Sequence, residues 1–117
     1  QINMIILWQL MRSTETTYNI EYADNRISLY AAQYGKCAVT GERLEYDEIH
    51  CHHIIPKSLG GTDRYSNLII VHKDIHKLIH ATRQETIETY LNKFVLDGKM
   101  LNKINKLRKN AKLPEII

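Results

Sequence analysis

The sequence contains few cysteines and no long apolar run, and these absences exclude several classes of protein. Two cysteines among 117 residues, Cys37 and Cys51, are too few for a disulfide scaffold, and we expect both to be reduced thiols of a cytoplasmic protein. No apolar stretch approaches the roughly 18 residues that a membrane-spanning helix needs. The apolar residues 5–11 lack the basic flank and small-residue cleavage site of a signal peptide. We therefore predict neither a membrane protein nor an exported one.

An excess of positive charge is also missing from most of the chain. Residues 1–92 carry nine basic against eleven acidic side chains, whereas residues 93–112 carry seven basic side chains against Asp97 alone. A basic tail on a nearly neutral body suits a protein that binds a polyanion, because each neutralised phosphate releases counterions. The alternative is a helix face that is simply solvated.

The remaining pattern predicts one small domain of helices and short strands. We expect helices over residues 1–12, 22–33, 73–81, 85–94 and 99–111, a loop over 14–17, a short buried segment over 68–71, and β-type runs over 36–39 and 48–52. Asp24 is a candidate cap of the second helix and Gly35 its natural stop. Residues 40–43 supply turn residues, so the two β-type runs are expected to pair as a hairpin.

The most informative feature is the clustering of histidines. All six lie within 31 residues, at positions 50, 52, 53, 72, 76 and 80. His72, His76 and His80 are spaced four apart, so their rings stack along one helix face about 5–6 Å from one another. His52 on a hairpin packed across this helix would be a third ligand for one ion. A single histidine is usually an ordinary hydrogen-bonded residue, but this clustering predicts a metal site.

The spacing of these residues resembles the HNH endonuclease motif. The motif words are the pair His52-His53, Asn67 fourteen residues after it, His76 nine further on and His80 four beyond that. The resemblance implies an α+β fold with a ββα-metal core, in which a β-hairpin and a helix hold one divalent metal ion, as in colicin DNases. Residues 22–41, 50–62, 67–71, 76–82 and 101–116 look like the C-terminal endonuclease domain of group II intron reverse transcriptase/maturase proteins.

This resemblance implies a domain organisation and a function. Residues 20–84 would be the HNH nuclease core, residues 1–19 a helical extension or linker from a longer chain, and residues 85–117 a basic helical extension. The function would be hydrolysis of a phosphodiester that nicks DNA, generating the primer end for intron homing, with intron RNA bound through the rest of the parent protein. The alternatives are a free-standing HNH nuclease and a non-catalytic, metal-stapled domain that binds nucleic acid.

The resemblance also implies a role for each motif residue. His53 would be the general base, since an imidazole can take a proton from water near neutral pH. His52, His76 and His80 would be the metal ligands. Asn67 would orient His53 or hold the loop, and in some relatives this position is a ligand. Consecutive side chains of a straight strand point to opposite faces. We therefore expect the strand to end or bend at His53, so that His52 and His53 can both reach one phosphate.

Several features depart from the family pattern or stay open. Thr40 and Ile75 stand where many relatives have cysteines of a structural zinc site, so the four-thiolate site cannot form, and Cys37 and Cys51 are expected to be buried thiols opposite each other across the hairpin. His50 is either a surface residue of the strand or a partner of a ligand. His72 either caps the helix or faces the substrate. Three imidazoles suit Mn, Co, Ni or Zn, whereas the family implies Mg or Mn in turnover.

The candidate DNA contacts are lysines. Lys99, Lys103 and Lys106 share a face of the last helix that lies away from its apolar stripe, and side chains of this kind contact the DNA backbone without reading bases. We predict that Lys57, Lys99, Lys103 and Lys106 bind DNA. If the last helix is only solvated, the path would follow Lys57, Arg64, Lys73 and Lys77.

Overall fold

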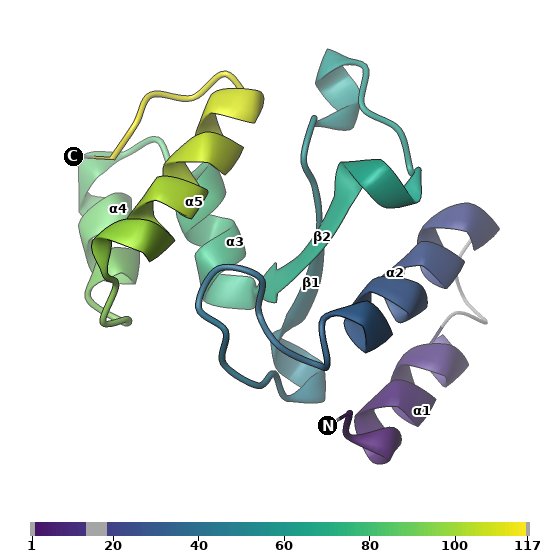
Figure 1. The fold of residues 1–117 in the computed structure, drawn as a ribbon. Coiled ribbons are helices and arrows are strands. Elements are labelled where there is room, and N and C mark those ends of the chain that lie inside the picture. The colour runs from purple at the N-terminus through teal and green to yellow at the C-terminus, as the bar shows by residue number, and fades with distance from the viewer. Residues whose placement is uncertain (1, 14–18, 117) are drawn as a thin grey trace.

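The computed structural model describes residues 2–13 and 19–116 (Figure 1). Its helices are α1 (Met4–Ser13), α2 (Ile20–Ala32), α3 (Lys73–His80), α4 (Gln84–Leu91) and α5 (Gly98–Asn110), and its strands are β1 (Ile49–His53) and β2 (Leu68–His72). Two antiparallel strands followed directly by a helix confirm the predicted α+β class and ββα arrangement. The loop expected over residues 14–17 lies outside the described residues. None of the helices in the described part of the chain is both long and apolar enough to cross a membrane.

The sheet joins different segments from those that the sequence pattern predicted. β1 pairs with β2, with Ile49 opposite His72 and His53 opposite Leu68. The predicted partner of β1, the run 36–39, was therefore wrong. The segment 68–71, which was expected only to be buried, supplies the second strand because its β-branched residues suit a pleated surface that is buried.

The run 36–39 folds instead into a closed loop against the outer edge of β2. Lys36 and Arg43 form an isolated β-bridge. The Ala38 amide donates to the carbonyl of Ile70 at 3.0 Å. Gly41 turns the loop with a φ of 74°, a conformation that glycine adopts without strain. The backbone groups of this loop are thus satisfied without pairing to β1.

The sheet lies between two helical layers (Figure 1). α2 covers one face. Gln33, which follows α2 directly, donates from its side chain to the Ile70 carbonyl and accepts from the Ile70 amide, both at 3.0 Å, along the outer edge of β2. α3 covers the other face, and α4 and α5 pack on α3. The centre of the core is fully buried and consists of Ile70, Val71, Ile75, Leu78, Ile79 and Ile104. α3 is therefore fixed against the sheet by apolar packing on its inner face.

Both ends of α2 are set by local chemistry. Its N-cap is Asn19, whose side chain accepts from the Tyr22 amide at 3.0 Å, so the helix starts earlier than expected and Asp24 is not the cap. Gly35, with a φ of 70°, ends the segment as predicted. A Cβ at this glycine would lie 2.9 Å from the hydroxyl oxygen of Tyr30, so a larger residue would clash as well as strain the backbone.

α5 is anchored to the end of α3 by a buried arginine. Arg108 is 1% exposed, and its guanidinium donates to the carbonyls of Leu78 at 2.9 Å and Ala81 at 2.7 Å. Burial lowers the pKa of this guanidinium. The hydrogen bonds satisfy carbonyls that the end of a helix leaves unpaired. One of the seven charges in the predicted basic tail is thus a structural link and not a surface charge.

Candidate metal centre and active site

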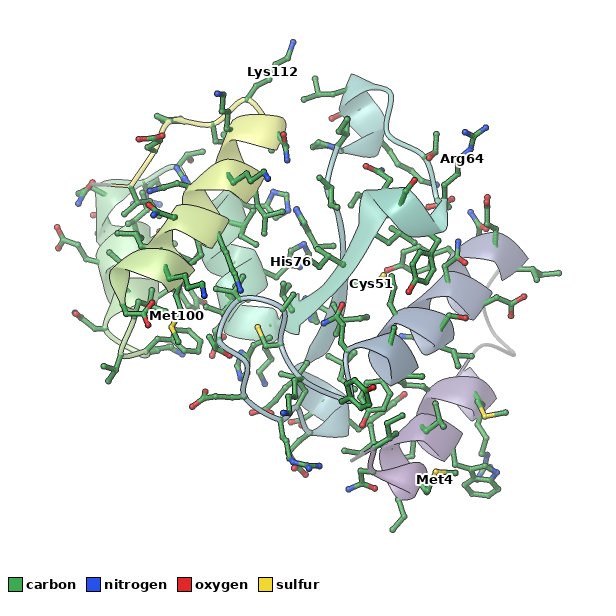
Figure 2. The ribbon with its side chains drawn as sticks, in the orientation of Figure 1. Met4, Cys51, Arg64, His76, Met100 and Lys112 are labelled. Carbon is green, nitrogen blue, oxygen red and sulfur yellow. The ribbon has the colours of Figure 1, made fainter. Side chains whose placement is uncertain are left out.

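Three histidines from β1 and α3 converge on one point. His52, His76 and His80 offer ligand atoms that all lie within 4.8 Å of one another. The ring centroid of His52 is 5.1 Å from those of both helical histidines, and His76 points from α3 toward the sheet (Figure 2). The spacing of four residues along α3 places the last two rings together, as the sequence predicted.

These residues fit a divalent metal ion. His52 is 1% exposed, yet both of its ring nitrogens are buried without a hydrogen-bond partner. A buried polar group left unpaired costs about 1–3 kcal/mol. Coordination of a metal ion by one of these nitrogens would remove part of that cost. Three neutral imidazoles form a donor set for a transition metal, and a metal requires the ring nitrogen to be deprotonated.

Electrostatics keep the cluster neutral. Burial, followed by the neighbouring His76 and His80, lowers the pKa of His52 to about 3. Burial and His80 lower the pKa of His76 to about 4, and burial also lowers the pKa of His80. Each ring is therefore available as a ligand at neutral pH without first losing a proton.

His50 is a partner of one of these histidines. Its Nδ1 lies 2.9 Å from Nδ1 of His76, and the two rings meet edge to face. The sequence left open whether His50 is a surface residue of the strand or a partner of a candidate ligand, and this contact favours the second role. A hydrogen bond at Nδ1 orients the ring and leaves Nε2 of His76 for the cluster.

His53 lies on the opposite face of the sheet from His52. Its ring stacks on that of Tyr22 in α2, with centroids 5.4 Å apart and planes inclined by 12°. Its Nε2 lies 2.7 Å from a carboxylate oxygen of Asp63. β1 ends at His53, as the sequence predicted.

The two faces meet in one cleft. His53, Cys51, Pro56 and Lys57 line a cleft of about 380 Å³ together with His76 and His80. The candidate base and two candidate ligands therefore open to the same space, although β1 sends its histidines to both faces of the sheet.

Asn67 holds the loop that follows β1. Its side-chain oxygen accepts from the Ile55 amide at 2.9 Å, and its amide nitrogen donates to the carbonyls of Ile55 and Thr62 at 3.1 and 2.8 Å. Gly61 packs so closely on this loop that a Cβ there would lie 1.7 Å from the carbonyl oxygen of Ile55. Asn67 thus holds the loop, which is one of its two expected roles. The close approach of Ile55 explains why position 61 is a glycine.

Asp63 is a residue of the site that the sequence did not point to. It is buried, accepts from His53, and pairs with Lys57 at 2.7 Å. No spacing rule links a carboxylate to a histidine ten residues earlier. The link arises because the loop held by Asn67 turns back on the end of β1. Lys57, a predicted DNA contact, thus carries an ion pair, although its side chain is 56% exposed.

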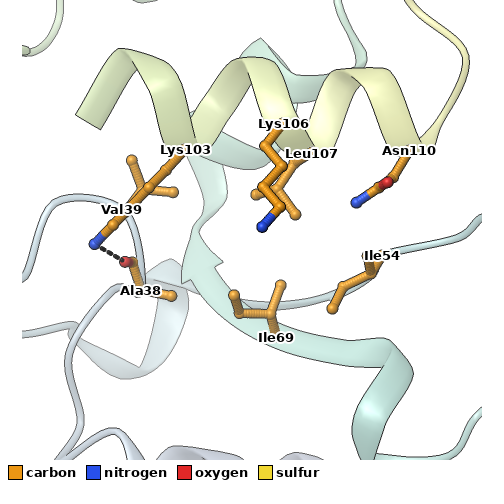
Figure 3. A pocket seen from close by; sticks show the side chains of 8 residues that line it. All are labelled: Ala38, Val39, Ile54, Ile69, Lys103, Lys106, Leu107 and Asn110. Atoms are coloured by element: carbon orange, nitrogen blue, oxygen red, sulfur yellow. Dashed lines mark hydrogen bonds between the residues drawn. The ribbon is translucent and has the colours of Figure 1, made fainter. Parts of the chain in front are cut away.

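Two lysines of α5, Lys103 and Lys106, line a second pocket between α5 and the sheet. Ala38, Val39, Ile54, Ile69, Lys103, Lys106, Leu107 and Asn110 line it (Figure 3). Lys103 donates to the Ala38 carbonyl at 3.3 Å across this pocket. Lys99 lies in the first turn of α5 and is exposed. The three lysines thus have unequal surroundings, and their role in DNA binding stays a prediction.

The remaining histidine and the cysteines have structural contacts. His72 caps α3, accepting from the Asp74 amide at 3.0 Å, which is one of its two expected roles. Cys37 and Cys51 are both buried free thiols, and burial raises the pKa of Cys51 to about 11. They do not lie opposite each other, since Cys51 pairs with Ile70 in the sheet.

Comparison with known proteins agrees with this geometry. Residues 36–82 match the HNH endonuclease family. The match covers both strands, α3 and every histidine of the site, although it is less than half of the chain. No curated protein and no solved structure matches the chain significantly. An HNH domain implies a nuclease or nucleic-acid-binding function that uses a divalent metal. The match does not reach residues 22–35 and 101–116, on which the likeness to group II intron proteins partly rests.

Proposed function

We propose that this chain is a metal-dependent DNA endonuclease that nicks a strand by hydrolysing a phosphodiester bond. The observation that carries the proposal is the shared cleft, into which His53 opens from one face of the sheet and His76 and His80 from the other. A base and a metal site must reach the same phosphate for hydrolysis, and this cleft is where both are accessible.

His52, His76 and His80 would hold the metal ion. When bound, the ion would stabilise the negative charge that develops on the phosphate and on the leaving 3′-oxygen. Mg or Mn is the proposed ion in turnover, and Zn or Ni also suits a site of three imidazoles. His50 would keep the ring of His76 turned toward the ion.

His53 would take the proton from the attacking water. Its ring is held by Asp63 and Tyr22, so it is already oriented in the absence of substrate. Asn67 would act on His53 through the loop that it holds at the end of β1. No side chain of the protein needs to become a nucleophile, because water attacks the phosphorus.

The proposed DNA contacts are Lys57, Lys99, Lys103 and Lys106. The biological setting that we propose, cytoplasmic homing of a group II intron with intron RNA bound by other parts of a maturase, rests on the sequence resemblance alone. Its test is to compare nicking of intron target sites by this chain with nicking by a protein in which it is joined to a polymerase.

The alternative is a domain that binds nucleic acid and uses the metal only for folding. The placement of His53 argues against it, since a purely structural metal site has no use for a second imidazole that opens to the same cleft. A free-standing nuclease would share the chemistry proposed above.

Incubation of supercoiled plasmid with the metal-free chain and Mg, Mn, Zn or Ni in turn tests the proposal. We expect a nicked circle with at least one ion, suppression by chelator, and no nicking by His76→Ala at the same ion concentration. DNA binding without nicking under all four ions would establish the non-catalytic alternative.

A further inference from the structure

Asp63 is the buried acidic side chain among the described residues. A carboxylate withdrawn from water costs free energy unless it is paired and hydrogen-bonded. The burial of Asp63 therefore needs a compensating interaction, and its partners on the α2 face of the sheet supply it.

The carboxylate is held from several directions. One oxygen faces Nε2 of His53 at 2.7 Å, and the other accepts from Lys57 at 2.7 Å and from the side-chain amide of Asn19. The backbone carbonyl of Asp63 accepts from the Asn25 side chain at 2.8 Å. Burial opposes ionisation, but the hydrogen bonds from Lys57 and His53 outweigh it and lower the pKa of this carboxyl. Asp63 is thus a fixed anion placed beside the His53 ring.

A fixed anion determines which nitrogen of the imidazole carries the proton. An ionised carboxylate can only accept a hydrogen bond, so Nε2 must donate and the neutral ring keeps its lone pair on Nδ1. Tyr22 restrains the same ring from its face. Together the two contacts fix both the tautomer and the rotation of His53.

We propose that Asp63 is the positioning residue of this nuclease, holding His53 in the Nε2–H tautomer so that Nδ1 is the atom that accepts the proton of water. This inference rests on the proposed function of His53 and adds the residue through which that function is set. Lys57 then neutralises the second oxygen of Asp63, which gives it a structural role besides the predicted contact with DNA.

The test compares Asp63→Asn with Asn25→Ala in steady-state nicking assays. The asparagine has the size of aspartate but no charge, and its amide can hold either tautomer. We expect a fall in kcat of roughly 10- to 100-fold, as for removal of other orienting partners, with KM and metal affinity changed by less than about twofold. Asn25→Ala removes a bond to the backbone of Asp63 but leaves the carboxylate on His53, so its kcat should stay within about twofold.

A second measurement needs neither a variant nor activity. The nitrogen chemical shifts of His53 in the wild-type protein distinguish the two neutral tautomers, and we expect the Nε2–H form. A proton on Nδ1, or an unchanged kcat in a folded Asp63→Asn protein, would overturn the inference while leaving the nuclease intact. A wild-type chain that nicks DNA with none of the four ions would instead overturn the proposed function itself, and this inference with it.

Discussion

The two faces of the small sheet treat their histidines in opposite ways. On the α3 face, the buried nitrogens of His52 have no hydrogen-bond partner. On the α2 face, His53 is bonded to Asp63 and stacked on Tyr22. Consecutive residues of one strand thus occupy an unsatisfied site and a satisfied one. This difference is consistent with the proposed roles, in which His52 is a metal ligand and His53 is a base that the protein orients.

The largest effect is expected on the α2 face, where removal of the proposed base should lower the nicking rate. His53→Ala should lower the nicking rate by about 10²- to 10⁴-fold, the usual contribution of a general base. Metal content should stay at the wild-type value, because the ring lies across the sheet from His52. Rates at saturating DNA and metal analysis of the purified variant are the measurements. Tyr22→Phe is the matched control, since it keeps the stacked ring and should retain most of the activity. Absence of bound metal in His53→Ala would make this residue a ligand.

On the α3 face, the next largest effect is expected from removing one of the proposed metal ligands. His76→Ala or His80→Ala should abolish the rise in melting temperature that a metal ion gives the wild type. An ion at a hundred times its Kd stabilises the folded state by about 2.7 kcal/mol, which corresponds to a shift of roughly ten degrees or more in a domain of this size. His72→Ala at the end of β2 is the control, because it removes the N-cap of α3 but no member of the histidine cluster. Full metal content in His80→Ala would reduce the helix to a single ligand.

The pH dependence of the metal-free protein separates the two faces further. The pKa of His52 in the folded chain, about 3, lies below the roughly 6.5 of an unfolded imidazole. Between these values the unfolded chain binds a proton that the folded chain does not, so stability falls as the pH is lowered from about 6.5 toward 3. His76, with a pKa of about 4, acts in the same direction. The slope should be at most about 1.4 kcal/mol per pH unit for each ring.

His52→Leu tests that slope directly. In chelator, the variant should be as stable as the wild type at pH 7 or about 1 kcal/mol more stable, because two unpartnered nitrogens are removed, and its decline in stability toward pH 4 should be shallower. His53→Leu is the comparison across the sheet and should be less stable than the wild type, since it leaves Asp63 without the imidazole. Urea unfolding at several pH values measures both. Equal slopes for His52→Leu and the wild type would contradict the assigned cause.

The cluster of His52, His76 and His80 could be predicted from the sequence, and its role as a metal site stays a prediction. The spacing of His76 and His80 fixes their shared helix face, and His52 follows from the family motif. The strand partner of β1 could not be chosen in the same way, since the runs 36–39 and 68–72 both suit a strand. The segment 68–72 pairs with β1 in the buried sheet, whereas the run 36–39 forms its backbone hydrogen bonds within its own loop and with the outer edge of β2. The partner of β1 is thus decided by contacts between segments that are not adjacent in sequence.

Two charged residues show a second limit. Asp63 reaches His53 only because Asn67 and Gly61 fold the intervening loop back on the strand. Arg108 belongs by sequence to the basic tail, yet it is buried against carbonyls at the end of α3. Sequence spacing describes neighbours along one element, and neither contact lies within one element.

The smallest effect is expected in the lysines of α5, which belong to neither face of the sheet. Replacing Lys99, Lys103 and Lys106 together by glutamine should weaken DNA binding similarly for all sequences. The slope of log affinity against log salt should shrink by up to about three units, at roughly 0.9 for each phosphate that is no longer neutralised. The change should be nearer to about two units if Lys103 keeps its bond to Ala38 when DNA is bound.

The rate at saturating DNA should change little in this triple variant, because the lysines lie outside the cleft that contains His53. Lys109→Gln with Lys112→Gln is the matched control, since these residues lie at and just beyond the C-terminal end of α5, and its salt slope should change less. If the triple variant keeps the wild-type slope, this face is only solvated, and the DNA path runs along Lys57, Arg64, Lys73 and Lys77. Lys57 bonds the oxygen of Asp63 that does not face His53, and its side chain is 56% exposed, so it could contact a phosphate while Asp63 keeps its contact with His53.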